Sequence, residues 1–209
     1  MSRYLGPRCR LCRRESEKLF LKGDRCHTEK CALERRKTTP GQHVRDRAPR
    51  ISGYGTQLRE KQKLRRTYGL QEQQFHTLYE KAAKKRGVTG VILLESLERR
   101  LDNIVHRMGF AASRSQARQL VRHQAILVDG SRVDVPSYQV PVGAVVEVAE
   151  KARQWLSVRA ALESAESRGI APWIEVEKDH FRGVFKRLPE RDELPPTIRE
   201  QLVVELYSK

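Results

Sequence analysis

The spacing of apolar residues predicts helices in the first half of the chain and a compact mixed module from residue 97 onward. Residues 75–83 carry apolar side chains at helical spacing and predict a core-facing helix that ends before Gly87. Residues 97–108 carry a second such stripe, which stops at Gly109. Residues 57–67 also favour a helix, but they carry five basic side chains and only two apolar ones, so this helix should be solvated or docked on an anion.

A helix predicted after residue 113 presents a row of arginines. Ser113 and Gln116 have the spacing of a capping box and mark its start. Arg114, Arg118 and Arg122 recur every four residues and therefore project from nearly one face. Arginines at this spacing repel one another when no acidic residue lies between them. We interpret this face as one that lies against phosphates rather than as a solvated helix face.

Short strands are predicted to follow that helix. Asp129 and Gly130 lie between two β-rich runs and predict a tight hairpin. Residues 144–150 and 173–188 predict further strands, and residues 151–168 predict a helix. The last stretch fits helical spacing better than strand spacing. The fold class is therefore α+β, with helices joined to a small antiparallel sheet.

Positive charge is concentrated in the first half of the chain. The 209 residues include 42 Lys and Arg against 26 Asp and Glu, a formal net charge of +16. Residues 1–50 carry 15 basic and 6 acidic side chains and residues 51–100 carry 11 and 5, whereas the remainder is nearly balanced. This distribution indicates a polyanionic partner, nucleic acid before an anionic membrane, and the first half should contact its phosphates.

Neither a membrane span nor secretion is predicted. The sequence has no run of about 18 apolar residues, and its N-terminal stretch lacks the apolar core of a signal peptide. We therefore expect an intracellular protein, in which structural disulfides are unusual.

The chain has four cysteines, namely Cys9, Cys12, Cys26 and Cys31. Two closely spaced pairs separated by a short loop are typical of four thiolates around one zinc ion. The arginines among them should favour the thiolate form by lowering the cysteine pKa; they are Arg8, Arg10, Arg13 and Arg14. An iron–sulfur cluster on the same thiolates and free or redox-active thiols are the alternatives. His27 is interpreted as a bystander.

The stretch after the cysteines contains Pro, Gly and Arg but no apolar periodicity. It spans residues 34–55 and predicts an extended arm lying on a partner, with a flexible linker as the alternative.

The module at 97–149 resembles the RNA-binding domain shared by several ribosome-associated and RNA-modifying proteins. The resemblance lies in LERRLDNIVHRMGFAASRSQARQLVRHQAILVDGSRVDVPSYQV. In that domain a helix-turn-helix and a hairpin clamp structured RNA. Four more stretches, RYLGPRCRLCRRE, PGQH, LREKQKLRRTYGL and EQLVVELYSK, extend the match over residues 3–209. Together they resemble the family of the bacterial small-subunit ribosomal protein numbered fourth.

This resemblance implies a non-enzymatic, primary rRNA-binding protein of the cytoplasmic ribosome. It implies binding to a helical junction in the 5′ domain of 16S rRNA and early nucleation of the body of the subunit. It also implies a place near the mRNA entry channel beside the fifth small-subunit protein, where it contributes to translational accuracy. For the fold it implies a metal-knotted N-terminal segment, a mainly helical N-terminal domain, and a C-terminus that packs back on the helical part.

The expected RNA contacts fall in two groups. In the module, the resemblance implies contacts by Ser113, Arg114, Ser115, Arg118 and His123, and the helix face adds Arg122. In the basic half, the expected contacts are Arg3, Arg8, Arg10, Arg13, Arg14, Arg35, Arg36, Lys37, Arg47, Arg50, Arg59, Lys61, Lys63, Arg65, Arg66, Lys84 and Lys85. The resemblance also carries metal ligation onto the four cysteines, and no catalytic residue is expected.

We divide the chain into a four-cysteine basic segment (1–45), a helical rRNA-binding domain (46–96), the RNA-binding module with its C-terminal helix and strands (97–190), and a returning C-terminal segment (191–209).

An RNA-modifying enzyme of the pseudouridine synthase type uses the same module and is the alternative function. The roughly 60 residues beyond the module are too few for a separate catalytic body. A zinc-finger regulator of DNA is disfavoured because the cysteine segment is too uniformly basic to read bases.

Overall fold

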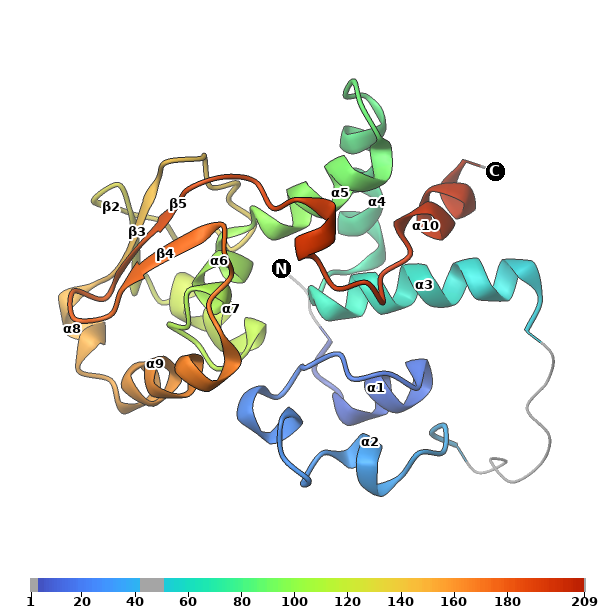
Figure 1. Cartoon of the computed structure of the whole chain (residues 1–209), viewed down its shortest axis with the longest axis horizontal. Coiled ribbons are helices and arrows are strands. Elements are labelled where there is room, and N and C mark those ends of the chain that lie inside the picture. Colours follow the sequence, from blue (N-terminus) through green and yellow to red (C-terminus); the bar gives the residue numbers. More distant parts are fainter. Residues whose placement is uncertain (1–3, 42–50, 209) are drawn as a thin grey trace. The chain divides into compact units, whose positions relative to one another are not determined.

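The structure is a computed structural model that describes residues 4–41 and 51–208, apart from the side chains of Glu166 and Ser167. It forms two compact units, drawn in Figure 1. Unit 1 contains the described residues up to Leu94 and those from Pro195 onward, and unit 2 is Glu95–Leu194. The finer division into four parts expected from the sequence stays a prediction.

Unit 1 is helical in the part that the structure describes. Its elements are α1 (Cys9–Glu15), the 3-10 helix η1 (Gly23–Cys26), α2 (Ala32–Arg35), α3 (Gly53–Thr67), α4 (Glu72–Ala83), the first part of α5 (Thr89–Glu98), and α10 (Glu200–Tyr207). The helices predicted around residues 57–67 and 75–83 and at the C-terminus are confirmed. Within the described residues, no helix combines the length and the apolar character needed to cross a bilayer.

The C-terminal helix α10 packs against α3, as Figure 1 shows. Gln57 Nε2 donates to Glu205 Oε2 across this contact at 2.9 Å. Buried Phe75 of α4 and Val203 of α10 contribute to the core of the unit. The expected return of the C-terminus to the helical part is therefore seen in the structure.

The start of α3 corrects the expected extended arm at 34–55. Ser52 is the N-cap of α3, and its hydroxyl oxygen accepts a hydrogen bond from the Gly55 N–H at 3.1 Å. This cap outweighs the low helix propensity of two glycines in the first turn. Residues 42–50 of the arm lie outside the described residues.

Unit 2 combines helices with one antiparallel sheet, so the α+β class is confirmed. Its helices are the end of α5, α6 (Leu101–Arg107), α7 (Arg114–Arg122), α8 (Glu150–Arg153), α9 (Leu156–Arg168) and the 3-10 helix η2 (Arg191–Glu193). Its strands are β1 (Ile126–Val128), β2 (Ser131–Arg132), β3 (Val145–Val148), β4 (Ile174–Glu177) and β5 (Arg182–Phe185). The sheet order is β2-β1-β3-β5-β4, with antiparallel neighbours throughout.

The predicted hairpin joins β1 to β2. Leu127 pairs with Arg132 and Val128 with Ser131, so the turn has two residues. Both turn residues are left-handed, with φ of 48° at Asp129 and 77° at Gly130. This is the geometry that an Asp-Gly pair favours in tight hairpins.

The helix predicted over 97–108 corresponds to the last two residues of α5 and to α6; most of α5, which begins at Thr89, was not predicted. Arg100 between them has extended backbone, with φ −63° and ψ 135°, and forms a bridge with Gln139. The Leu101 N–H then donates to the carbonyl oxygen of Tyr138 at 2.9 Å. The apolar period continues through this break, because a single extended residue reorients the helix without ending the buried stripe. The predicted helix 151–168 is likewise interrupted, near Trp155.

Two glycines let the elements of unit 2 approach closely. A Cβ on Gly183 of β5 would lie 2.8 Å from Met108 Sδ, so the sheet packs directly on the end of α6. A Cβ on Gly109 would lie 2.4 Å from Ala165 Cβ of α9, and Gly109 has a left-handed φ of 87°. Gly109 thus lets the chain turn at the end of α6 and leaves room for α9 to pack closely against it.

We expect Gly109→Ala to destabilise unit 2 by about 3 kcal/mol, since an L-residue at this φ costs roughly 1–2 kcal/mol and overpacking adds roughly 1–3 kcal/mol. Gly143→Ala is the matched control, because Gly143 has the same φ of 87° but a Cβ added there would have no atom within 4 Å. Urea unfolding followed by tryptophan fluorescence measures both losses. Equal losses would show that the Ala165 contact contributes nothing.

Candidate nucleic-acid interface

Helix α7 begins at a hydrogen-bonded cap. The Ser113 hydroxyl oxygen accepts from the Gln116 N–H at 3.4 Å, as predicted. The Gln116 side chain returns to the Ala112 N–H at 2.9 Å rather than to the N-cap residue itself. Ser113 Oγ also lies 3.1 Å from Ser115 Oγ, and both serines are half-buried. The predicted serine contacts are therefore grouped at the N-terminal turn of α7.

The three arginines of α7 all have partners from other segments. Arg114 Nε donates to Asn103 Oδ1 at 2.8 Å. Arg118 Nη1 lies 3.3 Å from Asp102 Oδ2, and its side chain is 12% exposed. Arg122 Nη1 is 3.8 Å from Asp134 Oδ2, and both of these side chains are largely exposed. No acidic residue lies between the arginines along α7, as the sequence indicated; the acidic partners come from elsewhere, Asp102 of α6 for Arg118 and Asp134 after β2 for Arg122.

A buried polar cluster lies beneath the first two of these arginines. It consists of Glu98, Arg100, Asp102 and Asn103, none more than 5% exposed. Arg100 and Asp102 are paired through two hydrogen bonds, at 3.0 and 2.8 Å. Sequence reasoning missed this cluster, because its polar residues stand within or beside an apolar helical stripe and carry no motif of their own.

Helix α3 carries five of the predicted RNA contacts of the basic half, and the structure gives each of these five a polar partner within unit 1. Lys61 and Lys63 are 8% and 7% exposed. Lys61 Nζ is 2.6 Å from Glu72 Oε1, while Lys63 Nζ is 2.9 Å from Glu60 Oε1 and 3.1 Å from Glu17 Oε2. Both ammonium groups therefore sit in internal contacts.

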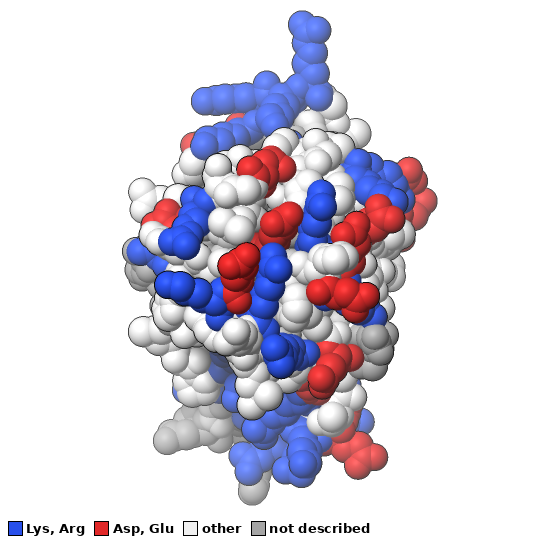
Figure 2. Space-filling view, turned by 90° about the vertical axis from the view of Figure 1, so that its left-hand side faces the viewer, with Lys and Arg blue, Asp and Glu red and all other residues white. Residues whose placement is uncertain are grey.

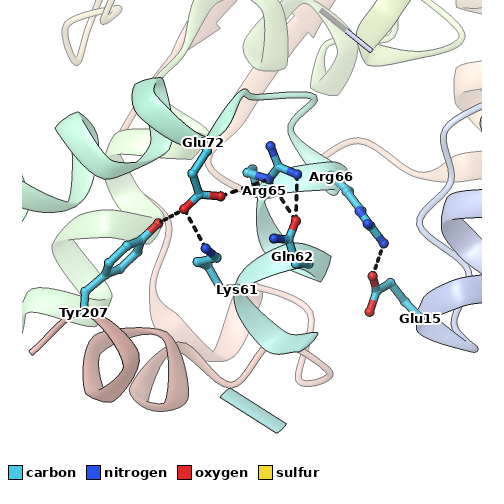
Figure 3. Close-up of polar contacts among 7 residues, drawn as sticks. All are labelled: Glu15, Lys61, Gln62, Arg65, Arg66, Glu72 and Tyr207. Carbon is cyan, nitrogen blue, oxygen red and sulfur yellow. Dashed lines mark hydrogen bonds and ion pairs between the residues drawn. The ribbon is translucent and has the colours of Figure 1, made fainter. Parts of the chain in front are cut away.

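The arginines of α3 point to two acidic partners, as Figure 3 shows for Arg65 and Arg66. Arg65 Nη2 donates to Gln62 Oε1 at 2.7 Å, and its Nε is 3.6 Å from Glu72 Oε2. Arg59 and Arg66 both pair with Glu15, a carboxylate whose side chain is 2% exposed. Burial raises the pKa of Glu15, and the two arginines oppose that rise. Glu15 thereby ties the cysteine-containing segment to α3.

Tyr207 ties α10 to the same cluster. Its hydroxyl donates to Glu72 Oε1 at 2.7 Å, and Lys61 Nζ lies 5.4 Å from the centre of its ring. Burial raises the pKa of Tyr207 well above its ordinary value, and the neighbouring Glu72 adds to the rise. Burial alone would raise the pKa of Glu72, but hydrogen bonds from Lys61 and Tyr207 outweigh it and lower that pKa.

The four cysteines lie in the N-terminal part of unit 1 and form no disulfide bond. Cys12, Cys26 and Cys31 are buried and Cys9 is half-buried. Burial, reinforced by neighbouring cysteines, raises the pKa of Cys12 and Cys26. At these two thiols burial, and not the nearby arginines, is the largest effect on the pKa.

The described residues contain no group of three or more His, Cys, Asp or Glu side chains arranged to hold a metal ion. The donor chemistry of the cysteines is nevertheless that of a zinc site. The Lys22 N–H donates to Cys26 Sγ at 3.3 Å, the kind of bond that backbone amides make to a ligating sulfur. His27 stacks on Phe20 with ring centres 4.9 Å apart.

The remaining predicted contacts lie on the surface or outside the described residues. Arg8 and Arg13 are half-buried, and Arg13 Nε donates to the Thr38 carbonyl oxygen at 2.9 Å. The exposed members are Arg10, Arg14, Arg35, Arg36, Lys37, Lys84, Lys85, Arg122 and His123. Arg3, Arg47 and Arg50 lie outside the described residues.

Basic and acidic side chains intermix across the middle of the face drawn in Figure 2, the side on which β2, β4 and α8 lie. Two ion pairs of the sheet have this character: Arg182 Nε is 3.5 Å from Glu147 Oε1, and Lys186 Nζ is 2.9 Å from Glu175 Oε2. Paired charges of this kind offer less attraction to a polyanion than a continuous basic surface.

Comparison with known proteins decides the family. Residues 3–98 match the ribosomal protein S4/S9 N-terminal domain, and residues 99–146 match the S4 domain. The chain belongs to the ribosomal protein S4 family. Proteins named small ribosomal subunit protein uS4 are similar to it over 100% of both chains: those of Nitrosospira multiformis and Azoarcus sp. are 58% identical, and that of Thermus thermophilus is 55% identical.

The S4 domain match contains the arginine row and most of the buried cluster. It begins at Arg99, spans α6, α7, β1 and β2, and ends at Val146 within β3. The other strands of the unit 2 sheet, β4 and β5, lie beyond it. In this S4 family chain the sheet is thus larger than the matched domain.

We expect Glu72→Gln to loosen α10, because it removes the charged acceptor shared by Lys61 and Tyr207. The pKa of Glu72 is lowered from 4.5, so its stabilising contribution is present above pH 4.5 and is lost as the pH falls through the lowered value. Hydrogen-exchange protection of Glu200–Tyr207, measured from neutral pH downward, should fall on acidification in the parent chain and start lower in the variant.

Glu80→Gln is the control for this experiment. Glu80 lies on the same helix, is exposed, and pairs only weakly with His76 at 3.4 Å. Its substitution should leave protection of α10 unchanged; an equal loss in both variants would show that charge on α4, rather than the Tyr207 contact, holds α10.

Proposed function

We propose that this protein is a structural, rRNA-binding constituent of the small ribosomal subunit in the cytoplasmic ribosome. The observation that carries the proposal is 55–58% identity over the whole chain to proteins named small ribosomal subunit protein uS4. The charge agrees with it, since a net +16 chain is suited to a phosphate-rich partner.

The protein acts by binding and not by catalysis. Its relatives over the whole chain are named as small ribosomal subunit proteins and not as enzymes. The alternative of a pseudouridine synthase type of enzyme is therefore not favoured. Affinity comes from Lys and Arg contacts to phosphate, and selectivity comes from the shape of folded RNA.

We assign the RNA contacts of unit 2 to the N-terminal turn and arginine face of α7, and those of unit 1 to its exposed basic residues. The serines and the first two arginines are half-buried and Arg122 is exposed, and all of them lie at the start of or along one short helix. Lys61 and Lys63 instead support the internal structure of unit 1, which their low exposure favours. The proposed RNA is a helical junction in the 5′ domain of 16S rRNA, bound early so that the body of the subunit assembles around it.

The proposed neighbours are other small-subunit proteins, the fifth in particular, and mRNA near its entry channel. At that place the protein contributes to translational accuracy. This part of the proposal rests on family resemblance alone.

We also propose that Cys9, Cys12, Cys26 and Cys31 hold one zinc ion, with an iron–sulfur cluster as the alternative occupant. Four thiols in one short segment, three of them buried, support the proposal. The small apolar cluster around Cys12, with Leu11, Leu19 and Leu21, is too limited to order this segment strongly by itself. A metal would cross-link it.

The first experiment compares affinities for a transcript of the 16S rRNA 5′ domain and for an unrelated folded RNA of equal length, across a salt series. A preference of about a thousandfold that survives rising salt would support shape-specific recognition. Equal affinities for the two RNAs that fall together as the salt concentration rises would show only non-specific binding of a polycation to phosphate, and would contradict the proposal.

The triple variant Arg114→Gln, Arg118→Gln, Arg122→Gln should bind the same transcript more weakly and reduce its salt slope by about 2 to 3, close to one for each phosphate that the helix no longer reaches. The matched control is Arg182→Gln, Lys186→Gln, Arg187→Gln, which removes three charges from exposed side chains of the same unit. An unchanged slope in the α7 variant would place this helix face toward solvent.

Chelation by EDTA, or by a stronger zinc chelator, should expose residues 4 to about 45 to trypsin and leave unit 2 intact. Elemental analysis of the purified protein before and after chelation identifies the metal. No metal and no change in cleavage would overturn the zinc proposal, and cleavage throughout the chain would show that the segment supports both units.

A further inference from the structure

The α5–α6 junction places two fully buried polar side chains directly under the arginine face of α7. Asp102 is 5% exposed and Asn103 is 1% exposed, and both lie in the first turn of α6. Burying a polar group costs folding free energy unless the group is hydrogen-bonded, so the fold depends on the contacts that these two side chains make.

Asp102 holds two arginines at once. Arg100, which is 3% exposed, donates from Nε and Nη2 to the two carboxylate oxygens at 3.0 and 2.8 Å. Arg118 of α7 donates from Nη1 to Oδ2 at 3.3 Å. The two hydrogen bonds from Arg100 fix the plane of the Asp102 carboxylate. The orientation of this plane determines where the Arg118 guanidinium binds.

Asn103 holds Arg114 through an amide whose orientation is set by its other contacts. Its Nδ2 donates to the carbonyl oxygen and to Oε2 of Glu98, at 3.0 and 2.8 Å. Its Oδ1 therefore faces Arg114 Nε, at 2.8 Å. Glu98 is itself fixed by Arg107, which donates to its two carboxylate oxygens at 3.0 and 2.8 Å. The chain of contacts thus runs from Arg107 to Arg114.

We propose that Asp102 and Asn103 are positioning residues, which set the guanidinium groups of Arg118 and Arg114 in the geometry that folded rRNA requires. The inference rests on the proposed function and deepens it. A free arginine side chain loses rotamer freedom when it binds, and anchoring it beforehand removes part of that cost. Two guanidinium groups fixed one helical turn apart also favour an RNA whose phosphates match that spacing, so the anchors add selectivity as well as affinity.

The direction in which substitution of Asp102 changes RNA affinity distinguishes a positioning role from a purely electrostatic one. Asp102 carries a negative charge close to the proposed RNA surface, so by charge alone its removal should strengthen binding to phosphate. If Asp102 positions Arg118, then Asp102→Asn should weaken binding instead, because an amide cannot accept hydrogen bonds at both of its positions from Arg100 and Arg118. The two explanations predict opposite changes.

The experiment measures affinity for the 16S rRNA 5′-domain transcript, its salt slope, and preference over an unrelated folded RNA. The full-length variants are Asn103→Ala, Asp102→Asn, Arg114→Gln and the double variant of Asn103→Ala with Arg114→Gln. Two controls accompany them. Val146→Ala removes buried volume from β3, which supplies no member of the cluster, and Glu175→Gln removes one exposed acidic charge from the same unit.

We expect Asn103→Ala to lower the affinity for the 5′-domain transcript, and the preference for it over the unrelated RNA, about tenfold. The salt slope should not change, because Arg114 keeps its charge and loses only its fixed orientation. In the Arg114→Gln background the same substitution should have little further effect on affinity. Asp102→Asn should bind several-fold more weakly, whereas Glu175→Gln should bind as well as or better than the parent chain.

Thermal melting of each variant separates positioning from loss of fold. If Val146→Ala, at an equal loss of melting temperature, lowers affinity as much as Asn103→Ala, the effect belongs to the fold and the inference is overturned. Tighter binding by Asp102→Asn, or additive losses in the double variant, would also overturn it. If Arg114→Gln itself leaves affinity and salt slope unchanged, the proposed RNA surface on α7 fails together with the inference, and that result is distinct from the others.

Discussion

Carboxylates paired with lysine and arginine side chains at the contacts between helices are the interaction on which both units depend. In unit 1, Glu15 joins α1 to α3 through Arg59 and Arg66, and Glu72 gathers Lys61 and Tyr207. In unit 2, Asp102 joins the segment before α6 to α7. A chain with a large excess of positive charge repels itself, and each of these carboxylates offsets that repulsion at a point where two elements meet.

The two carboxylates of unit 1 show how closely this balance depends on local partners. Glu15 has two arginines nearby, yet burial raises its pKa. Glu72 is less enclosed and accepts hydrogen bonds from Lys61 and Tyr207, which lower its pKa. Proximity of opposite charge is therefore not sufficient by itself; the number of hydrogen bonds and the extent of desolvation decide which form the fold favours.

Pairing with carboxylates separates the basic residues that support the fold from those that stay exposed. Lys61 and Lys63 are occupied within unit 1, whereas Arg122 and His123 at the end of α7 are exposed. Between these extremes, Arg114 and Arg118 are anchored from below while their helix lies at the surface of the S4 domain. A protein that recognises folded RNA by shape needs this intermediate class, because its contacts must be both cationic and fixed in place.

Local features were predictable from the sequence, and long-range partners were not. The capped start of α7, the Asp-Gly hairpin, the C-terminal helix and the concentration of charge follow from propensity, spacing and composition, which depend on neighbouring residues. The break at Arg100 and the burial of Lys61 arise only when Gln139 and Glu72 come alongside. Contacts such as Gln57 with Glu205, 148 residues apart, leave no local signal. The sequence by itself thus determined several of the elements, the basic half and the family. The tertiary structure decided where helices break and which cations are structural and which stay at the surface, because that depends on where distant residues, the carboxylates above all, are placed.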